Sequence, residues 1–259
     1  MSAMLRRRGV AGFAIFTLVM ATSFAGLGVW QLQRRTEKHQ LMSALNERLA
    51  APPVALPPSA QWSALKPASD EFRRVTYTAT YAALPDAMVY SSGSAVREDV
   101  GGPGTWAFLP ARLESGETVV VNIGFVQNTM QDRAQQDRAV NRLVAGQPVR
   151  LTGYIRFPES TGVLTPPENP AKRLWFTRDH LAMARALGWA SGGALAPFYV
   201  DLESPTPESG TPKPGRLTVH LKDDHLQYAI TWFTLAFAVV IAFGVWWRGQ
   251  RSPGLLQRP

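Results

Sequence analysis

A histidine stands at the start of a long uncharged segment, followed by aromatic residues one and two helical turns farther on. His225, Tyr228 and Trp232 fall on one face of a helix, because residues three and four positions apart lie one above the other. Imidazole is a usual axial ligand of haem iron, and aromatic rings can lie along the macrocycle. The pattern is therefore compatible with a haem ligand. A histidine at the membrane interface that caps the helix with Asp224, or one that relays protons, fits the same position.

The residues before this histidine bear on its protonation. Asp223 and Asp224 precede His225 directly, and carboxylates favour the charged imidazolium. A metal needs the neutral ring, so this detail counts against ligation.

The segment that carries the histidine is long enough to cross a membrane. Residues 225–247 contain no formal charge, and a helix rises about 1.5 Å per residue against a hydrocarbon core of roughly 30 Å. Ala229 and Ala236 share the face of His225, whereas the opposite face carries Gln227, Thr231, Thr234 and Ala238. Polar side chains in lipid need partners, so we expect one neighbouring helix from this chain and a second from another protein.

A second uncharged segment, residues 10–32, follows three arginines near the N-terminus. A cleaved signal peptide is the alternative interpretation, since Ser23 and Ala25 resemble a cleavage site. The apolar run is too long for an ordinary signal peptide, and Trp30 suits a retained membrane anchor. Small residues suited to close packing against the second segment recur along it: Ala21, Ala25 and Gly28.

Charge predicts the orientation of both segments. The short tails 1–9 and 248–259 are basic and contain no acidic residue, whereas a long translocated loop escapes the positive-inside rule. We therefore expect both tails in the cytoplasm and residues 33–224 in the periplasm. His225 and Trp30 then lie at the same outer interface of a multi-pass protein of the inner membrane.

Composition narrows the function classes. The chain has 259 residues, a net charge of +8 and no cysteine, so thiolate metal sites and cysteine nucleophiles are excluded. The basic residues concentrate in the tails and just beyond the first span, which suggests membrane anchoring and not nucleic-acid binding. His180 beside Asp179 could act as a base with an orienting acid, but both belong to a helix start. We expect no enzyme; a membrane-anchored hydrolase would need a nucleophile to converge on His180.

The central part is expected to be rich in strands. The first helix should continue over residues 33–50 until Pro52 and Pro53, and a helix is predicted over 177–188 with Thr177 as its N-cap. Alternation and turn residues predict strands over 73–82, 87–92, 105–113, 117–126, 148–157, 197–203 and 216–222, and a loop or short helix over 129–145. The expected fold is a membrane protein in which two transmembrane α-helices flank a β-rich α+β extracytoplasmic domain. Regularly spaced strands favour an antiparallel barrel or sandwich.

Five strings in order carry a resemblance over nearly the whole chain. G-V-W-Q-L-Q-R-R-T-E-K (28–38) and H-L-Q-Y-A-I-T-W-F-T-L-A (225–236) are the most specific. Between them lie G-G-P-G-T-W-A-F-L-P-A-R-L, V-V-V-N-I-G-F-V and E-N-P-A-K-R-L-W-F-T-R-D. The chain resembles the surfeit locus protein 1 family, membrane proteins involved in assembling cytochrome c oxidase.

The resemblance implies an assembly factor, as in bacterial members, that binds haem a and supplies it to oxidase subunit I. Oxidase subunit I, other assembly proteins and the lipid bilayer are the expected partners. A histidine at the place of His225 is the proposed haem ligand of the family. Tyr228, Trp232 and Trp30 would surround the ring, and Arg34 or Arg35 would pair with the propionates or with lipid headgroups. The alternative is a haem-independent scaffold that stabilises oxidase subunits during assembly.

The chain departs from the family pattern in two places. Ile123-Gly124-Phe125 stands where the family usually shows Arg-Gly-Trp, which argues against a charge-dependent role for that turn. Asp223-Asp224 stands where asparagines usually precede the histidine.

Overall fold

The computed structural model describes residues 2–94, 96–97, 99–127, 133–144, 146–190, 193–218 and 223–251, without the side chains of 2–8, 133, 135, 136, 139 and 251. The chain divides into two compact units, Met1–Ser43 with Leu221–Pro259, and Ala44–His220. The first unit is a pair of helices. The second is built around a β-sheet.

Both long helices contain apolar stretches that could cross a membrane. Helix α1 is Ser2–Ala50 and helix α5 is His225–Arg251. Their candidate spans are Gly9–Ala50 and His225–Gln250. The 26 residues of the second give a length of about 39 Å, more than the hydrocarbon core requires. By length and composition the two helices are compatible with a membrane protein. Helix α1 ends shortly before Pro52, which cannot continue it.

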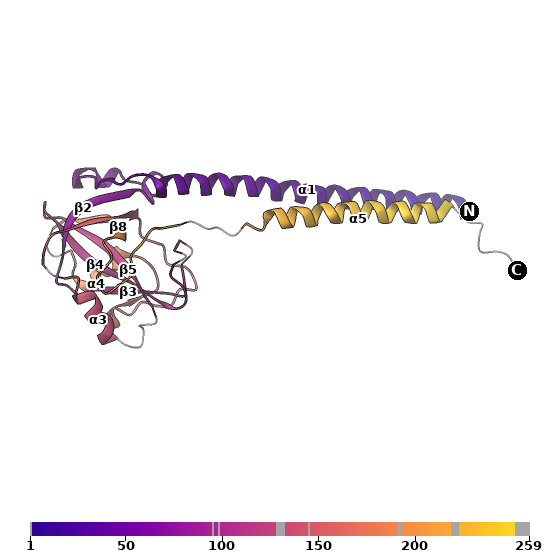
Figure 1. Cartoon of the computed structure of the whole chain (residues 1–259). Helices are drawn as coiled ribbons and strands as arrows, with labels where there is room; N and C mark the ends of the chain where they lie inside the picture. The colour runs from indigo at the N-terminus through magenta and orange to yellow at the C-terminus, as the bar shows by residue number, and fades with distance from the viewer. Residues whose placement is uncertain are drawn as a thin grey trace. The chain divides into compact units, whose positions relative to one another are not determined.

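The two helices pack side by side in opposite directions (Figure 1). The ring centroids of Phe13 and Trp246 are 4.7 Å apart, and those of Phe24 and Trp232 are 5.6 Å apart. A later residue of α1 thus contacts an earlier residue of α5, as expected for antiparallel helices. A Cβ at Gly28 would lie 2.7 Å from the Phe233 ring. The small residue predicted for close packing therefore lets the second helix approach.

The less exposed residues of α5 recur at steps of four and three, as in a coiled-coil seam. They include His225, Ala229, Trp232, Ala236, Val239, Phe243 and Trp246. The predicted face is confirmed for four of its members and wrong for Tyr228, whose side chain is 55% exposed. A seam that steps from 225 to 229 leaves position 228 outside it.

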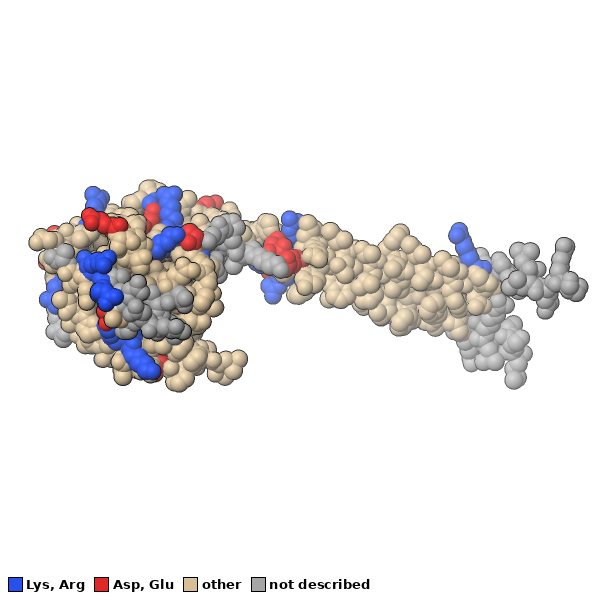
Figure 2. All heavy atoms as spheres, turned by 60° about the horizontal axis from the view of Figure 1, so that its bottom comes forward, with Lys and Arg blue, Asp and Glu red and all other residues tan. Residues whose placement is uncertain are grey.

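The surface of the helix pair is uncharged over its middle part. Figure 2 shows no Lys, Arg, Asp or Glu there on the face drawn, with charged groups at both ends of the pair. The sequence has no charged residue between Arg8 and Arg34 or between Asp224 and Arg248. An uncharged middle part with charged ends is the distribution expected of membrane-spanning helices.

The second unit contains a mixed sheet of eight strands in the order β1-β2-β6-β8-β5-β4-β3-β7. The strands are β1 Val54–Ala55, β2 Arg74–Tyr81, β3 Ala87–Ser91, β4 Gly104–Leu113, β5 Thr118–Gln127, β6 Val149–Arg156, β7 Leu174–Trp175 and β8 Leu195–Ser204. β2 also pairs with β4, so the pairings β2–β6–β8–β5–β4 return to β2. The barrel-like or sandwich-like form stays a prediction.

The prediction of an antiparallel sheet is wrong for three strand pairings. β1 is parallel to β2, β3 to β7 and β5 to β8. β6, β7 and several short helices lie between β5 and β8 in the chain, and a connection of that length allows the chain to return in the same direction. The predicted strand 216–222 is also wrong over 216–218, which are irregular, and its remainder lies outside the described residues.

Short helices complete this unit. They are η1 Ser59–Ala64, α2 Pro67–Asp70, α3 Arg133–Asn141, η2 Pro170–Lys172 and α4 His180–Leu187. The N-cap of α4 is Asp179 and not the predicted Thr177, because the Asp179 carboxylate accepts hydrogen bonds from the amides of Leu181 and Ala182. Gly188 ends α4 in a left-handed conformation, as the sequence predicted.

The core lies against β4 and β5, which are buried along almost their whole length. A strand buried on both faces needs apolar residues at consecutive positions, as in Val119-Val120-Val121. These strands also bring Trp106 and Asn122 into the interior.

Candidate functional site

Helix α5 begins at the histidine singled out by the sequence. The Asp223 carboxylate accepts a hydrogen bond from the His225 amide at 3.1 Å, which satisfies one of the free N–H groups at the helix start. The cap thus comes from Asp223, and the imidazole of His225 takes no part in it.

The His225 ring is held by the other helix of the pair. Its Nδ1 lies 2.8 Å from Oε1 of Gln31 on α1. An amide oxygen only accepts hydrogen bonds, so Nδ1 carries the proton and donates it. In the neutral ring this leaves the lone pair on Nε2, for which the described residues provide no hydrogen-bond partner. Metal-binding histidines are usually fixed in this way.

The carboxylate of Asp223 contacts residues of α1. Oδ2 of Asp223 accepts a hydrogen bond from Nε2 of His39 at 2.6 Å and lies 3.4 Å from Nε of Arg35. The hydrogen bond from His39 is the main reason that the pKa of Asp223 is lowered. The Asp223 carboxylate makes no ion pair with the His225 ring among the described residues.

The aromatic residues expected around a ring do not form one wall. Trp232 stacks against Phe24 between the two helices, with an interplanar angle of 27°. Tyr228 and Trp30 are 55% and 48% exposed, and Trp30 lies 5.9 Å from the Arg34 guanidinium. The structure therefore brings His225 to Gln31, and leaves Tyr228 and Trp30 open on the outer surface.

The two arginines proposed for propionate binding have different ion-pair partners. Arg34 forms an exposed ion pair of 2.9 Å with Glu37 one helical turn away. Arg35 is turned to Asp223. Exposed pairs contribute little stability, so Arg34 can exchange its partner at small cost.

The threonine face of α5 satisfies its own hydroxyl groups. Thr231 donates to the carbonyl of Gln227 at 2.9 Å and Thr234 donates to that of Ile230 at 2.8 Å. Threonine in a helix commonly bonds to the carbonyl four residues earlier. These hydroxyls therefore do not by themselves require the second neighbouring helix expected from another protein.

The sheet unit holds a buried ion cluster that sequence reasoning missed. Arg156 binds Glu71 at 2.6 Å and Asp201 at 2.7 Å, and Asn122 donates to Asp201 at 2.6 Å. Burial alone would lower the pKa of Arg156, but Tyr199, Asp201 and Glu71 together raise it. No local pattern signals the cluster, because its members come from segments far apart in the sequence. An acid inside an otherwise apolar strand, as at Asp201, was the one available sign.

His180 is a core residue. It is fully buried, and its Nε2 donates to the carbonyl of Ala196 at 3.1 Å. Asp179 uses its carboxylate to cap α4, so it does not orient the ring as in a catalytic pair. Within the described part of the chain, no three His, Asp or Glu side chains gather to hold a metal ion.

Burial of His180 makes the sheet unit sensitive to acid. Burial lowers the pKa of His180 from 6.5 to about 4 in the folded state. Between these values the unfolded chain binds more protons, so this contribution is complete above pH 6.5 and is lost as the pH falls toward 4. We expect the free energy of unfolding to fall by about 1–2 kcal/mol between pH 6.5 and pH 5. His180→Gln keeps a donor for Ala196, and its free energy of unfolding, measured by urea titration, should change less between pH 6.5 and pH 5 than that of wild type. An equal pH dependence in the variant and in wild type would contradict the assignment.

The fold and the site together define a class of protein. A long apolar helix near each end flanks a mixed-sheet domain, and a histidine of one helix is held by a glutamine of the other. The chain belongs to the SURF1 family, whose model matches residues 18–237.

Similar proteins occur in distant organisms. A SURF1-like protein of Monosiga brevicollis is 30% identical over 259 residues, covering 95% of this chain and 92% of that one. Surfeit locus protein 1 of Rattus norvegicus is 31% identical over 249 residues, covering 92% and 76%. The Homo sapiens protein is 31% identical over 239 residues, covering 86% and 73%.

Proposed function

We propose that this chain is an assembly factor for cytochrome c oxidase that binds haem a through His225 and helps its insertion into subunit I. Family membership supports the assembly role. The observation that carries the haem role is the 2.8 Å hydrogen bond from Nδ1 of His225 to Gln31. With Nδ1 as the donor, the neutral ring has its lone pair on Nε2, which is the form that iron accepts.

The proposed location is the inner membrane, with both tails in the cytoplasm and the sheet domain in the periplasm. The uncharged helix pair and the basic tails support this orientation. The His225–Gln31 pair would then lie at the outer interface, where a flat amphipathic molecule can place its apolar body in lipid and its charged edge in water.

The residues present fit haem in part. When bound, haem would supply the iron and the conjugated macrocycle that the oxidase requires. His225 would offer Nε2, and Gln31 would hold the imidazole in the required orientation. Tyr228 and Trp30 are exposed enough to cover a ring, and Arg34 can exchange Glu37 for a propionate. Trp232 already packs against Phe24, so its role is to hold the two helices together.

The test is haem a content of the full chain, purified in mild detergent from cells that make haem a, by pyridine haemochrome and visible spectrum. We expect His225→Ala to lose the bound haem and Gln31→Leu to lower affinity about tenfold to hundredfold, since outer-shell partners of metal ligands have effects of that size. His39→Gln is the matched control, because it changes a nearby histidine but keeps a donor for Asp223.

Either of two results would contradict the haem assignment. Equal haem content in wild type and His225→Ala would remove His225 as the ligand. Colourless preparations of all variants would favour the haem-independent scaffold, which should then co-purify with oxidase subunit I without haem.

A further inference from the structure

A cavity of about 290 Å³ lies in the sheet unit. Aromatic side chains of Tyr90, Trp106 and Phe176 line it together with Arg156, Arg178 and Glu159. Its volume is at the lower end of small-molecule sites, roughly 300–1,000 Å³. All of its lining residues belong to this unit, so the cavity is independent of the helix pair.

Trp106 contributes a buried donor without a partner. Its side chain is 3% exposed, and its Nε1 has no hydrogen-bond acceptor among the described residues. Leaving such a group unbonded costs about 1–3 kcal/mol, so buried tryptophan nitrogens usually find a partner. A ligand oxygen in the cavity that Trp106 lines would satisfy it.

Arg178 contributes the available positive charge. Its guanidinium lies 4.8 Å from the Trp106 ring, and in the described part of the chain it forms no ion pair with a carboxylate. Arg156 differs, since Glu71 and Asp201 already compensate its charge. A carboxylate of a ligand would therefore meet Arg178 and the indole donor at the same wall.

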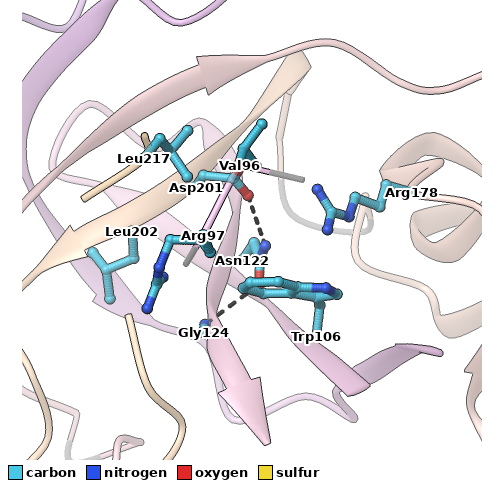
Figure 3. Close-up of a pocket in the computed structure, with 9 residues that line it drawn as sticks. All are labelled: Val96, Arg97, Trp106, Asn122, Gly124, Arg178, Asp201, Leu202 and Leu217. Carbon is cyan, nitrogen blue, oxygen red and sulfur yellow. Dashed lines mark hydrogen bonds between the residues drawn. The ribbon is translucent and has the colours of Figure 1, made fainter. Parts of the chain in front are cut away.

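The Trp106 side chain in the cavity wall also contacts Arg97. Figure 3 shows Arg97 and Arg178 approaching Trp106 from different sides, and the Arg97 guanidinium lies 5.9 Å from the ring. Arg97 is held by Asp99 at 2.6 Å and by the carbonyl of Pro214 at 3.1 Å. The smaller cavity drawn in Figure 3, of about 10 Å³, could hold no more than one water molecule. The indole is thus placed before any ligand arrives.

The surrounding acids limit the ligand to a single negative charge. Glu159 is an exposed residue of the cavity and lies beside Arg178: its amide donates to the carbonyl of Arg178 at 3.2 Å, and its carboxylate accepts a hydrogen bond from the amide of Arg178 at 3.4 Å. Asp201 and Glu71 are paired with Arg156 and do not line this cavity. A phosphate or a dicarboxylate would place further negative charge beside the Glu159 carboxylate, whereas a single carboxylate can be directed at Arg178.

We propose that this cavity binds a small organic monocarboxylate with a flat apolar body. The carboxylate receives hydrogen bonds from Arg178 and from Nε1 of Trp106, and the apolar body lies against the rings of Tyr90 and Phe176, which pack edge to face with centroids 6.1 Å apart at the cavity wall.

The test uses 4-fluorobenzoate as the probe and the full chain in detergent, with binding followed by fluorine NMR line broadening. Arg178→Gln and Trp106→Phe should each weaken binding about tenfold to hundredfold, as expected for loss of a charge-assisted hydrogen bond or of a buried donor. Arg185→Gln is the matched control, because this exposed arginine of α4 carries the same charge and does not line the cavity. Unlabelled benzoate should displace the probe, and inorganic phosphate should not.

Three outcomes would overturn the proposal. The first is no broadening above that of a protein-free micelle sample. The second is equal broadening in Arg178→Gln and Arg185→Gln, and the third is displacement by phosphate as effective as by benzoate. Trp106→Phe tests the donor only if its near-ultraviolet circular dichroism matches that of wild type; Arg178→Gln, at a partly exposed position, decides the proposal in either case. A negative result leaves the haem assignment untouched, since His225 belongs to the other unit.

Discussion

Replacing Arg156 with Gln is expected to lower the free energy of unfolding of the sheet unit by about 3–5 kcal/mol. The guanidinium is bound by Glu71 on one side and by Asp201 on the other, and Asp201 is only 4% exposed. Its removal leaves two carboxylates close together without their common cation. Burying an uncompensated charge costs far more than the intact pair contributes.

The measurement is equilibrium urea unfolding of the full chain in detergent, followed by near-ultraviolet circular dichroism. Arg216→Gln is the control, because Arg216 also pairs with an acid, Glu203 at 3.1 Å, but its side chain is 71% exposed. The control should lose less than about 1 kcal/mol. Adding Asp201→Asn to Arg156→Gln should restore part of the loss, since one unpaired charge disappears. Equal midpoints for Arg156→Gln and Arg216→Gln would show that the cluster does not stabilise the fold.

Gly124→Ala is expected to destabilise the same unit by about 3–5 kcal/mol, through combined backbone strain and overpacking. Gly124 has a φ of +129°, and a Cβ there would lie 2.4 Å from the carbonyl carbon of Lys213 and 2.5 Å from the nitrogen of Pro214. Phe125 and Lys213 exchange two backbone hydrogen bonds, of 3.0 and 2.8 Å, so the facing segment cannot move away freely.

Gly101→Ala provides the comparison for this prediction. A Cβ at Gly101 meets nothing within 4 Å, and its backbone lies outside the left-handed region. Its unfolding midpoint in urea should stay near that of wild type, whereas Gly124→Ala should unfold at markedly lower urea. A Gly124→Ala protein as stable as Gly101→Ala would mean that the contact with Lys213 is not maintained in solution.

The same contact explains what the turn around Gly124 needs. The residues on either side of Gly124, Ile123 and Phe125, are 0% and 4% exposed. Phe125 packs on Trp106 with ring centroids 5.1 Å apart. The turn therefore requires a glycine for close approach and apolar neighbours for packing. This agrees with the expectation that a charge has no role there.

The sequence determined the two long helices, α4 and most of the strands. An apolar segment of more than twenty residues without a charge can leave water by spanning a membrane as a helix. The two long helices therefore follow from composition and length. Alternation located β2, because its side chains face the core and the surface in turn, and apolar segments bounded by turn residues located β3, β4, β5, β6 and β8. The two-residue strands β1 and β7 escaped prediction, since two residues are too few to show a period.

Strand order and direction depended on the tertiary structure. Local patterns say which residues form a strand but not which strand lies beside it. The parallel pairing of β5 with β8, and the second pairing of β2 with β4, join segments distant in sequence. The N-cap of α4 shifted from Thr177 to Asp179 for a related reason, because both residue types can cap a helix and only the folded geometry selects one.

For the candidate site, the sequence supplied the chemistry and the tertiary structure supplied the arrangement. His225 could be singled out from its position before an uncharged helix. Its partner Gln31 lies almost two hundred residues earlier, and no spacing rule connects two side chains across antiparallel helices. The seam of the helix pair decided that Trp232 packs inward and Tyr228 stays exposed. Sequence fixes which atoms can donate or bind, whereas packing between distant segments decides which of them meet, because hydrogen bonds and ion pairs act only over a few ångströms.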